Sequence, residues 1–101
     1  MMRMPEFRFL TNHGNALLLV ARDPRIRISD IASLLDITER AARRVVADLT
    51  KSGYLDREKD GRRSVYRVKT DLPLHLPFQR DRDIKSLLEL LANADTTGSS
   101  R

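Results

Sequence analysis

The sequence predicts a mainly α-helical fold that carries one small antiparallel β-hairpin. Apolar residues recur at helical spacing in four separate segments of the chain. After the third segment, an Asp60-Gly61 pair separates two stretches rich in strand-forming residues. The net charge of +5 is concentrated in the same region. Residues 39–69 contain ten Lys or Arg and five Asp or Glu, whereas the rest of the chain contains nine of each.

The composition indicates a single small soluble domain. The 101 residues allow one modest core, and 41% hydrophobic with 33% charged residues is typical of a globular protein. No apolar run approaches the roughly 20 residues of a membrane span, and the N-terminus has no extended apolar segment like that of a secretory signal. We therefore expect a cytoplasmic protein. Without cysteine, no disulfide or thiolate zinc site is possible, and nothing in the sequence indicates a metal or another cofactor.

The first helix is expected from about His13 to Arg22, with Thr11 or Asn12 as its N-cap. Asp23-Pro24 ends it, because the residue before a proline avoids helical backbone angles. Residues 16–21 are all apolar, so we expect this helix to be buried nearly all round.

A short strand and a second helix are expected next. Ile26 and Ile28 alternate with Arg27, and this period of two predicts the strand. Ser29 is a plausible N-cap for a helix over Ser29–Asp36, whose apolar residues form its inner face.

The third helix is expected over Thr38–Ser52, with Thr38 as N-cap and Gly53 as the left-handed residue that ends it. Its apolar residues recur at helical spacing and are predicted to point inward: Ala41, Ala42, Val45, Val46 and Leu49. The remaining residues are predicted to point outward: Glu39, Arg40, Arg43, Arg44, Ala47, Asp48 and Lys51.

The hairpin is expected to pair Tyr54–Lys59 with Arg62–Lys69 around an Asp60-Gly61 turn. Arg62 and Arg63 directly follow its tip. The register is not determined by the sequence, so it remains open which of these two arginines points outward.

The C-terminal part is expected to consist of a connector and a last helix. Two prolines in residues 70–78 predict an extended connector, and Gln79–Asn93 has the apolar period of a helix. We divide the chain into an N-terminal arm (1–11), a core domain (12–69), the connector (70–78), the last helix (79–94) and a flexible tail (95–101).

The last helix is predicted to form a dimer interface. Its apolar face consists of Ile84, Leu87, Leu88 and Leu91. This face either folds back on the first helix of its own chain or pairs with a second copy, and we favour the second copy. The residues that are expected to join the interface are Phe7, Phe9, Leu74, Leu76 and Phe78.

Two stretches combine these features in order: ISDIASLLDITERAARRVVADLTKSGYL over 28–55 and DGRRSVYRV over 60–68. Their capping, alanine and apolar positions, with the Gly-Tyr-Leu exit, resemble the winged helix-turn-helix domain of the MarR and ArsR classes of transcriptional regulators. The resemblance covers about residues 12–69. One departure is Asp36 at the turn, where many such domains have glycine, and aspartate tolerates unusual backbone angles better than most residues.

The resemblance implies that the third helix lies in the major groove of DNA and that the wing meets the flanking backbone or minor groove. The residues that it implies for DNA contact are Thr38, Glu39, Arg40, Arg43, Arg44, Arg62 and Arg63. Glu39 either accepts from cytosine or pairs with Arg43, which we favour, and Arg44 is expected to be partly occupied by Asp48. The function implied is a sequence-specific regulator, expected to be a repressor, that binds a palindromic operator as a homodimer.

The main alternative is a winged-helix adaptor whose basic face binds an acidic protein partner, and RNA binding is a weaker third. An enzyme is not expected, because His13 and His75 are the only histidines and no nucleophile motif, carboxylate pair or phosphate-binding loop accompanies them. Metal sensing of the ArsR kind has little support, because the chain has no cysteine and only two histidines. A small-molecule effector is possible, but no residue identifies one.

Overall fold

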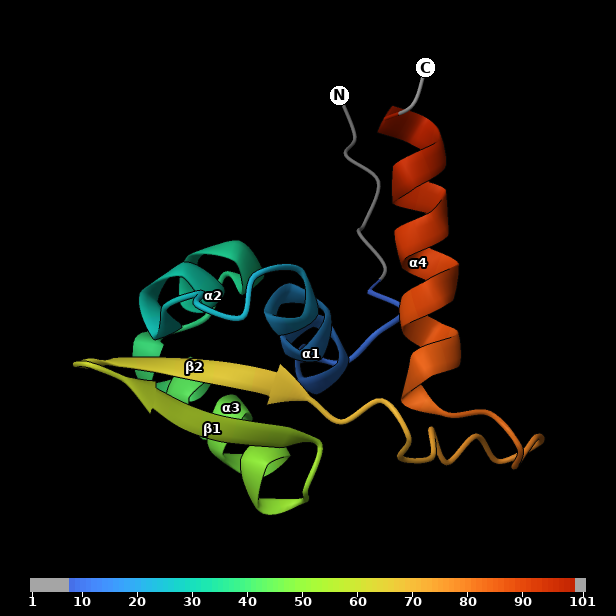
Figure 1. Ribbon diagram of the computed structural model, residues 1–101, viewed down its shortest axis with the longest axis horizontal. Coiled ribbons are helices and arrows are strands. Elements are labelled where there is room, and N and C mark those ends of the chain that lie inside the picture. Colours follow the sequence, from blue (N-terminus) through green and yellow to red (C-terminus); the bar gives the residue numbers. More distant parts are fainter. Residues whose placement is uncertain (1–7, 100–101) are drawn as a thin grey trace, which may run out of the picture.

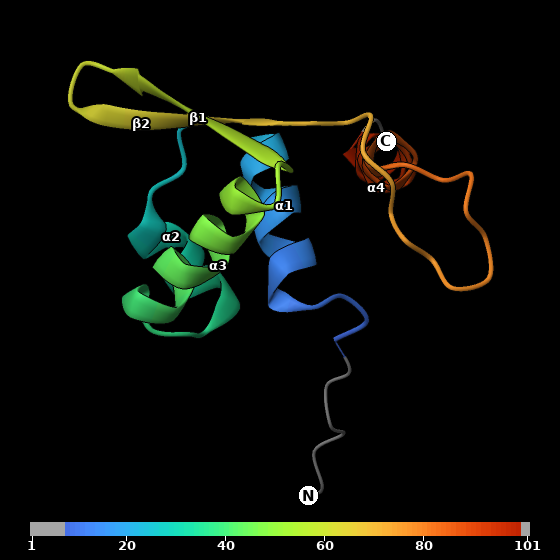
Figure 2. The ribbon, with the colours of Figure 1, turned by 90° about the horizontal axis from the view of Figure 1, so that it is seen from below.

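The computed structural model describes residues 8–99. It contains the helices and strands α1 (Asn12–Arg22), α2 (Ile28–Leu35), α3 (Glu39–Lys51), β1 (Leu55–Asp60), β2 (Arg63–Val68) and α4 (Ile84–Ser99). The predicted fold class is confirmed: α1, α2 and α3 lie on one side of the β1–β2 hairpin (Figure 2). The hairpin tip and α4 lie at opposite ends of the molecule (Figure 1).

The core lies between the three helices and the base of the hairpin. Its fully buried residues include Val20 of α1, Ile31 of α2 and Leu55 of β1. Tyr66 covers the core from β2. Burial of α1 is less complete than predicted, because Ala21 is exposed and Leu19 only half-buried.

Hydroxyl caps fix the start of α1 and α3. Thr11 accepts a hydrogen bond from the Gly14 amide (3.2 Å), which decides between the two predicted caps of α1. Thr38 accepts from the Ala41 amide (3.0 Å), as predicted. The prediction of Ser29 as the N-cap of α2 was wrong, since the helix begins at Ile28 with Arg27 as its N-cap. The Asp30 carboxylate accepts a hydrogen bond from the Arg27 amide and so closes the first turn before Ser29.

Two left-handed residues end α2 and α3. Asp36 follows α2 with φ 57° and ψ 49°, which places an aspartate where a glycine is most easily accommodated. Gly53 follows α3 with φ 89°, as predicted from the sequence. These two reversals set the angle between α2 and α3 and the path of the chain into the hairpin.

The strand predicted around Ile26 and Ile28 does not form. The Ile26 amide turns back to the carbonyl of Asp23 (3.0 Å), the Arg27 amide bonds to Asp30, and Ile28 already belongs to α2. A hydrogen bond from the Tyr66 amide to the Pro24 carbonyl (3.0 Å) still fastens this segment to the outer edge of β2.

The hairpin register places the turn one residue later than predicted. Asp60 pairs with Arg63, so the two turn residues are Gly61 and Arg62. Gly61 has φ 65°, and among residues 8–99 the only other residues with positive φ are Asp36, Gly53 and His75. A positive φ at the first turn residue alone is the pattern of a type II′ turn, which favours glycine at that position.

The start of α4 also differs from the prediction, since the helix begins at Ile84 and not at 79. Its first two amides donate to carbonyls of the connector, Ile84 to Leu72 and Lys85 to Thr70 (2.9 Å each). Asp83 caps the helix by accepting from the Ser86 amide (3.0 Å) and hydroxyl (3.1 Å). At its other end the helix continues to Ser99, through much of the segment predicted to be a flexible tail.

The connector is held to the base of the hairpin. The Tyr54 hydroxyl donates to the Pro73 carbonyl (2.8 Å), and the Lys69 amide donates to the Tyr54 carbonyl (2.9 Å). Phe7, predicted to join a dimer interface, lies outside the described residues. Within residues 8–99, none of the helices has the length and apolar character required to cross a membrane.

Candidate nucleic-acid interface

The exposed face of α3 brings four of the predicted site residues together. Thr38, Arg40, Arg43 and Arg44 line one shallow depression, whose remaining lining residues are Ala41 and Ala47. The two alanines leave space between the longer arginine side chains. Glu39 is exposed at the start of the helix and does not line this depression.

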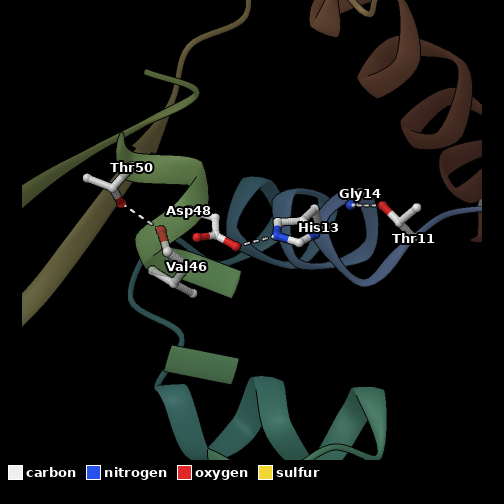
Figure 3. Close-up of polar contacts among 6 residues, drawn as sticks. All are labelled: Thr11, His13, Gly14, Val46, Asp48 and Thr50. Carbon is white, nitrogen blue, oxygen red and sulfur yellow. Dashed lines mark hydrogen bonds and ion pairs between the residues drawn. The ribbon is translucent and has the colours of Figure 1, made fainter. Parts of the chain in front are cut away.

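The carboxylates of α3 do not neutralise these arginines. The expected pair of Glu39 with Arg43 is wrong, because neither has an ion-pair partner among residues 8–99. The expected pair of Arg44 with Asp48 is also wrong. Asp48 instead bonds to His13 of α1, with 2.9 Å between Nε2 and Oδ2 (Figure 3).

One face of the hairpin carries three carboxylates, each with its own cation. Asp56 lies 3.4 Å from Lys69, and Glu58 lies 3.6 Å from Arg67. Asp60, next to the tip, pairs with Arg25 of the segment that precedes α2. The negative charge of the hairpin is therefore confined to one face and locally balanced.

The opposite face of β1 carries Arg57 and Lys59, which alternate with these carboxylates along the strand. The Arg57 Nε donates to the Ser64 hydroxyl (2.9 Å), and Lys59 has no ion-pair partner among the described residues. Arg57 lines a groove between α3 and the hairpin that also contains Arg43 and Lys51. Arg57 was not among the predicted site residues, although the alternation Asp56-Arg57-Glu58-Lys59-Asp60 contained the signal.

The register settles the question about the two arginines at the wing tip. Arg62 is a turn residue and is exposed, without an ion-pair partner among residues 8–99. Arg63 begins β2, and its guanidinium donates to the backbone carbonyl of Arg25 (2.7 Å). Arg62 is therefore available for an external partner, whereas Arg63 already braces the wing.

The predicted dimer-interface residues divide into two groups. Ile84 is buried in the core of its own chain, so it does not lie on an external surface, contrary to the prediction. Leu88 is half-buried where it packs against that core. Further along α4, Leu90 is 67% and Leu91 38% exposed. Leu87 is half-buried.

The ionisable side chains of residues 8–99 form no cluster suited to a metal ion. Among residues 8–99, no three His, Asp or Glu side chains gather as a metal ion would require. One carboxyl group has a shifted pKa: hydrogen bonds from the Ser86 amide and hydroxyl hold the pKa of Asp83 below its usual value. This group caps α4 and lies outside the basic surface.

A model of the MarR family matches residues 10–63, just over half of the chain. Two solved structures are similar. A MepR variant from S. aureus bound to an oligodeoxyribonucleotide has a TM-score of 0.54 at 17% identity, covering 89% of this chain and 63% of its own. The zinc-dependent MarR regulator AdcR, in its zinc(II)-bound state, has a TM-score of 0.47 at 22% identity, covering 68% of this chain and 49% of its own.

The chain thus spans less than two thirds of the length of either regulator. No curated protein sequence matches it. The likeness to MepR supports the fold, and the family match covers α1, α2, α3, β1 and the hairpin turn.

Proposed function

Because the chain belongs to the MarR family of transcriptional regulators, we propose that it binds double-stranded DNA and regulates transcription. The observation that carries the proposal is the exposed face of α3, where Arg40, Arg43 and Arg44 lie together without carboxylate partners among the described residues. Such a concentration of unpaired guanidinium groups creates a positive potential that attracts a polyanion. Family membership also argues against an enzyme.

In the proposed complex, α3 lies in the major groove and the wing approaches the flanking backbone or minor groove. The forked guanidinium groups of Arg40, Arg43 and Arg44 suit the guanine edge or a phosphate. The Thr38 hydroxyl accepts from the Ala41 amide and keeps its own hydrogen for donation to DNA. Glu39, without an ion-pair partner among residues 8–99, is positioned to accept from cytosine.

The wing contributes through two residues with different roles. Arg62 at the exposed tip contacts the minor groove or a phosphate. Arg63 keeps the wing in position through its bond to the Arg25 carbonyl. Of the two wing arginines predicted to contact DNA, Arg62 is thus proposed to contact it directly and Arg63 to act indirectly.

The protein is further proposed to act as a homodimer on a palindromic operator, as a repressor. Beyond its first two turns, α4 stands apart from α1, α2 and α3 (Figure 1) and exposes Leu90 and Leu91. A second copy that covers these leucines would bury apolar surface now in contact with water. Two recognition helices about 34 Å apart would then reach successive major grooves.

The DNA proposal is tested by the triple variant Arg40→Ala/Arg43→Ala/Arg44→Ala, with fluorescence anisotropy on duplexes from the region upstream of its own gene. At about 1 kcal/mol or more per arginine contact, we expect affinity to fall at least roughly a hundredfold. The matched control is Arg67→Ala/Lys69→Ala/Lys85→Ala, which removes the same charge from cations that already have carboxylate partners. We expect the control to lose only a few-fold.

Equal losses in the two triple variants would show that only the net charge matters and would contradict α3 as the recognition element. Absence of salt-dependent duplex binding by the wild-type protein would contradict the DNA proposal itself. The α3 surface would then be assigned to an acidic protein partner, the alternative that the sequence left open.

The dimer proposal is tested by Leu91→Asp in sedimentation equilibrium. We expect a monomer, because a carboxylate would be buried without a partner in the interface. Leu91 is preferred to Leu88 since Leu88 packs against the core of its own chain. The control is Lys85→Asp on another face of α4, which should stay dimeric, and a dimeric Leu91→Asp variant would place the interface elsewhere.

A further inference from the structure

A hollow beside the outer edge of β2 is lined by four arginines and differs in its lining residues from the depression on α3. It lies between the segment that precedes α2 and the tip of the hairpin. Its lining residues are Arg25, Ile26, Arg27, Ile28, Arg62, Arg63, Ser64 and Tyr66. Within the described residues, Asp60 is the one carboxylate that pairs with a guanidinium group of these arginines. Asp23 and Asp30 accept hydrogen bonds from the backbone amides of Arg25 and Arg27.

Two of the four arginines form fixed walls. Arg25 is held by its ion pair with Asp60, and Arg63 is held by its bond to the Arg25 carbonyl (2.7 Å). The bond from the Tyr66 amide to the Pro24 carbonyl closes the far end of the hollow. The segment and the hairpin are therefore braced against each other at three points, which keeps the hollow open and fixed in shape.

The other two arginines, Arg27 and Arg62, have no ion-pair partner among residues 8–99. Ser64, which lines the same hollow, adds a backbone donor. Alternate amides of a strand point to the same edge, so the Ser64 amide points away from β1 in the same direction as the Tyr66 amide. The hollow thus combines two unpaired guanidinium groups and one edge amide, all of them donors.

We propose that this hollow is a binding site for a phosphate-type oxyanion, held by Arg27, Arg62 and the Ser64 amide. Guanidinium forks bind such anions with two parallel hydrogen bonds, and an edge amide adds a third direction of donation. Arg63, whose guanidinium donates to a neutral carbonyl, adds a further positive charge nearby, whereas the charge of Arg25 is balanced by Asp60. The same chemistry is offered by a DNA backbone phosphate beside the wing and by a free phosphate-bearing anion.

For the backbone phosphate, the proposal rests on DNA binding and deepens it, since Arg27 then extends the interface to the start of α2. For the free anion, the proposal stands without DNA binding. Arg27 is the informative residue, because no other role has been given to its side chain and its backbone bond to Asp30 survives a change to alanine.

The first arm of the test is an NMR titration with inorganic phosphate at constant ionic strength. We expect a saturable shift of the Ser64 amide in the wild-type protein and its loss in Arg27→Ala/Arg62→Ala. The control Arg67→Ala/Lys85→Ala, with the same change of charge, should keep the shift.

The second arm measures duplex affinity against salt. One lost phosphate contact lowers the slope of log K against log salt by about 0.9, so Arg27→Ala should show this reduction and Arg67→Ala should not. A positive result in the first arm alone supports the site and identifies a free anion as its ligand. A positive result in the second alone supports it and identifies the DNA backbone.

The proposal is overturned if the Ser64 amide shows no saturable shift and Arg27→Ala keeps the wild-type salt slope. If the wild-type protein binds no duplex, the proposed function fails, and the phosphate titration alone decides about the hollow. The two proposals can therefore fail separately.

Discussion

α3 and α4 are both amphipathic, but each exposes the opposite kind of surface. α3 buries its apolar residues Val45, Val46 and Leu49 in the core of its own chain and presents arginines to solvent. α4 anchors only its first two turns in that core, through Ile84 and Leu88, and presents Leu90 and Leu91 to solvent. For α3 the unsatisfied groups are positive charges, and for α4 they are apolar side chains.

This difference indicates that the two helices meet different partners. Unpaired cations are satisfied by a polyanion, whereas exposed leucines are satisfied by another apolar surface. Because the wing tip and α4 lie at opposite ends of the molecule, both partners can be bound at the same time (Figure 1). Matched substitutions in the two helices test this difference.

The largest contrast is expected between two leucine truncations. Leu49→Ala in α3 should lower the free energy of unfolding by about 2–5 kcal/mol, because it leaves a cavity in the core. Leu90→Ala in α4 should change it by about 0.5 kcal/mol or less, because the side chain is already largely in water. Urea denaturation followed by circular dichroism measures both, in a Leu91→Asp background so that dimerisation does not contribute.

Similar losses in the two variants would show that Leu90 belongs to the same cooperative core as Leu49, and would contradict the different roles of α3 and α4. A loss at Leu90 that appears only without Leu91→Asp would instead locate its contribution in the dimer.

A smaller effect is expected from the cap of α3. Thr38→Ala should lower the free energy of unfolding by about 1 kcal/mol, because the Ala41 amide loses its partner. Thr50→Ala in the same helix is the matched control. Its hydroxyl donates to the Val46 carbonyl within the helix (2.8 Å; Figure 3), a bond that contributes little because that carbonyl is already in the helical ladder.

Thermal unfolding of the two variants checks this prediction. Equal losses of stability in the Thr38→Ala and Thr50→Ala variants would contradict the role of the Thr38 hydroxyl as a helix cap. Because Thr38 is also a candidate DNA contact, the stability measurement separates its structural role from any loss of affinity.

The sequence predicted those parts of the fold that depend on neighbouring residues. The ends of α3 follow from Thr38 and Gly53, both local signals, and were predicted closely. The start of α4 depends on carbonyls of Thr70 and Leu72, more than ten residues earlier, and was missed by five residues. Helical period cannot reveal such partners, because it describes one segment at a time.

The candidate site divides in the same way. The period of α3 correctly placed its arginines on one exposed face. Their electrostatic state was not predictable, since the partner of Asp48 is His13, a residue 35 positions away. Arg57 was predictable but missed, because the strict alternation of charge along β1 already separates its acids from its bases.

The smallest expected effect contrasts a carboxylate cap with a hydroxyl cap. Hydrogen bonds from Ser86 lower the pKa of Asp83, so the folded state favours the carboxylate form. The resulting stabilisation is present above the unfolded pKa of about 3.9 and is lost as the pH falls through the lower folded value.

In an NMR titration, the Ser86 amide should therefore shift with a midpoint below the usual aspartate pKa, and α4 should fray from its first turn. Asp83→Asn should abolish this midpoint, while the Gly14 amide, bonded to the Thr11 hydroxyl in a first turn without acidic residues, should show no corresponding transition. A Ser86 midpoint at or above the usual value would show that the Asp83 bonds do not hold α4 in solution, and the anchoring of this helix would then rest on the connector carbonyls alone.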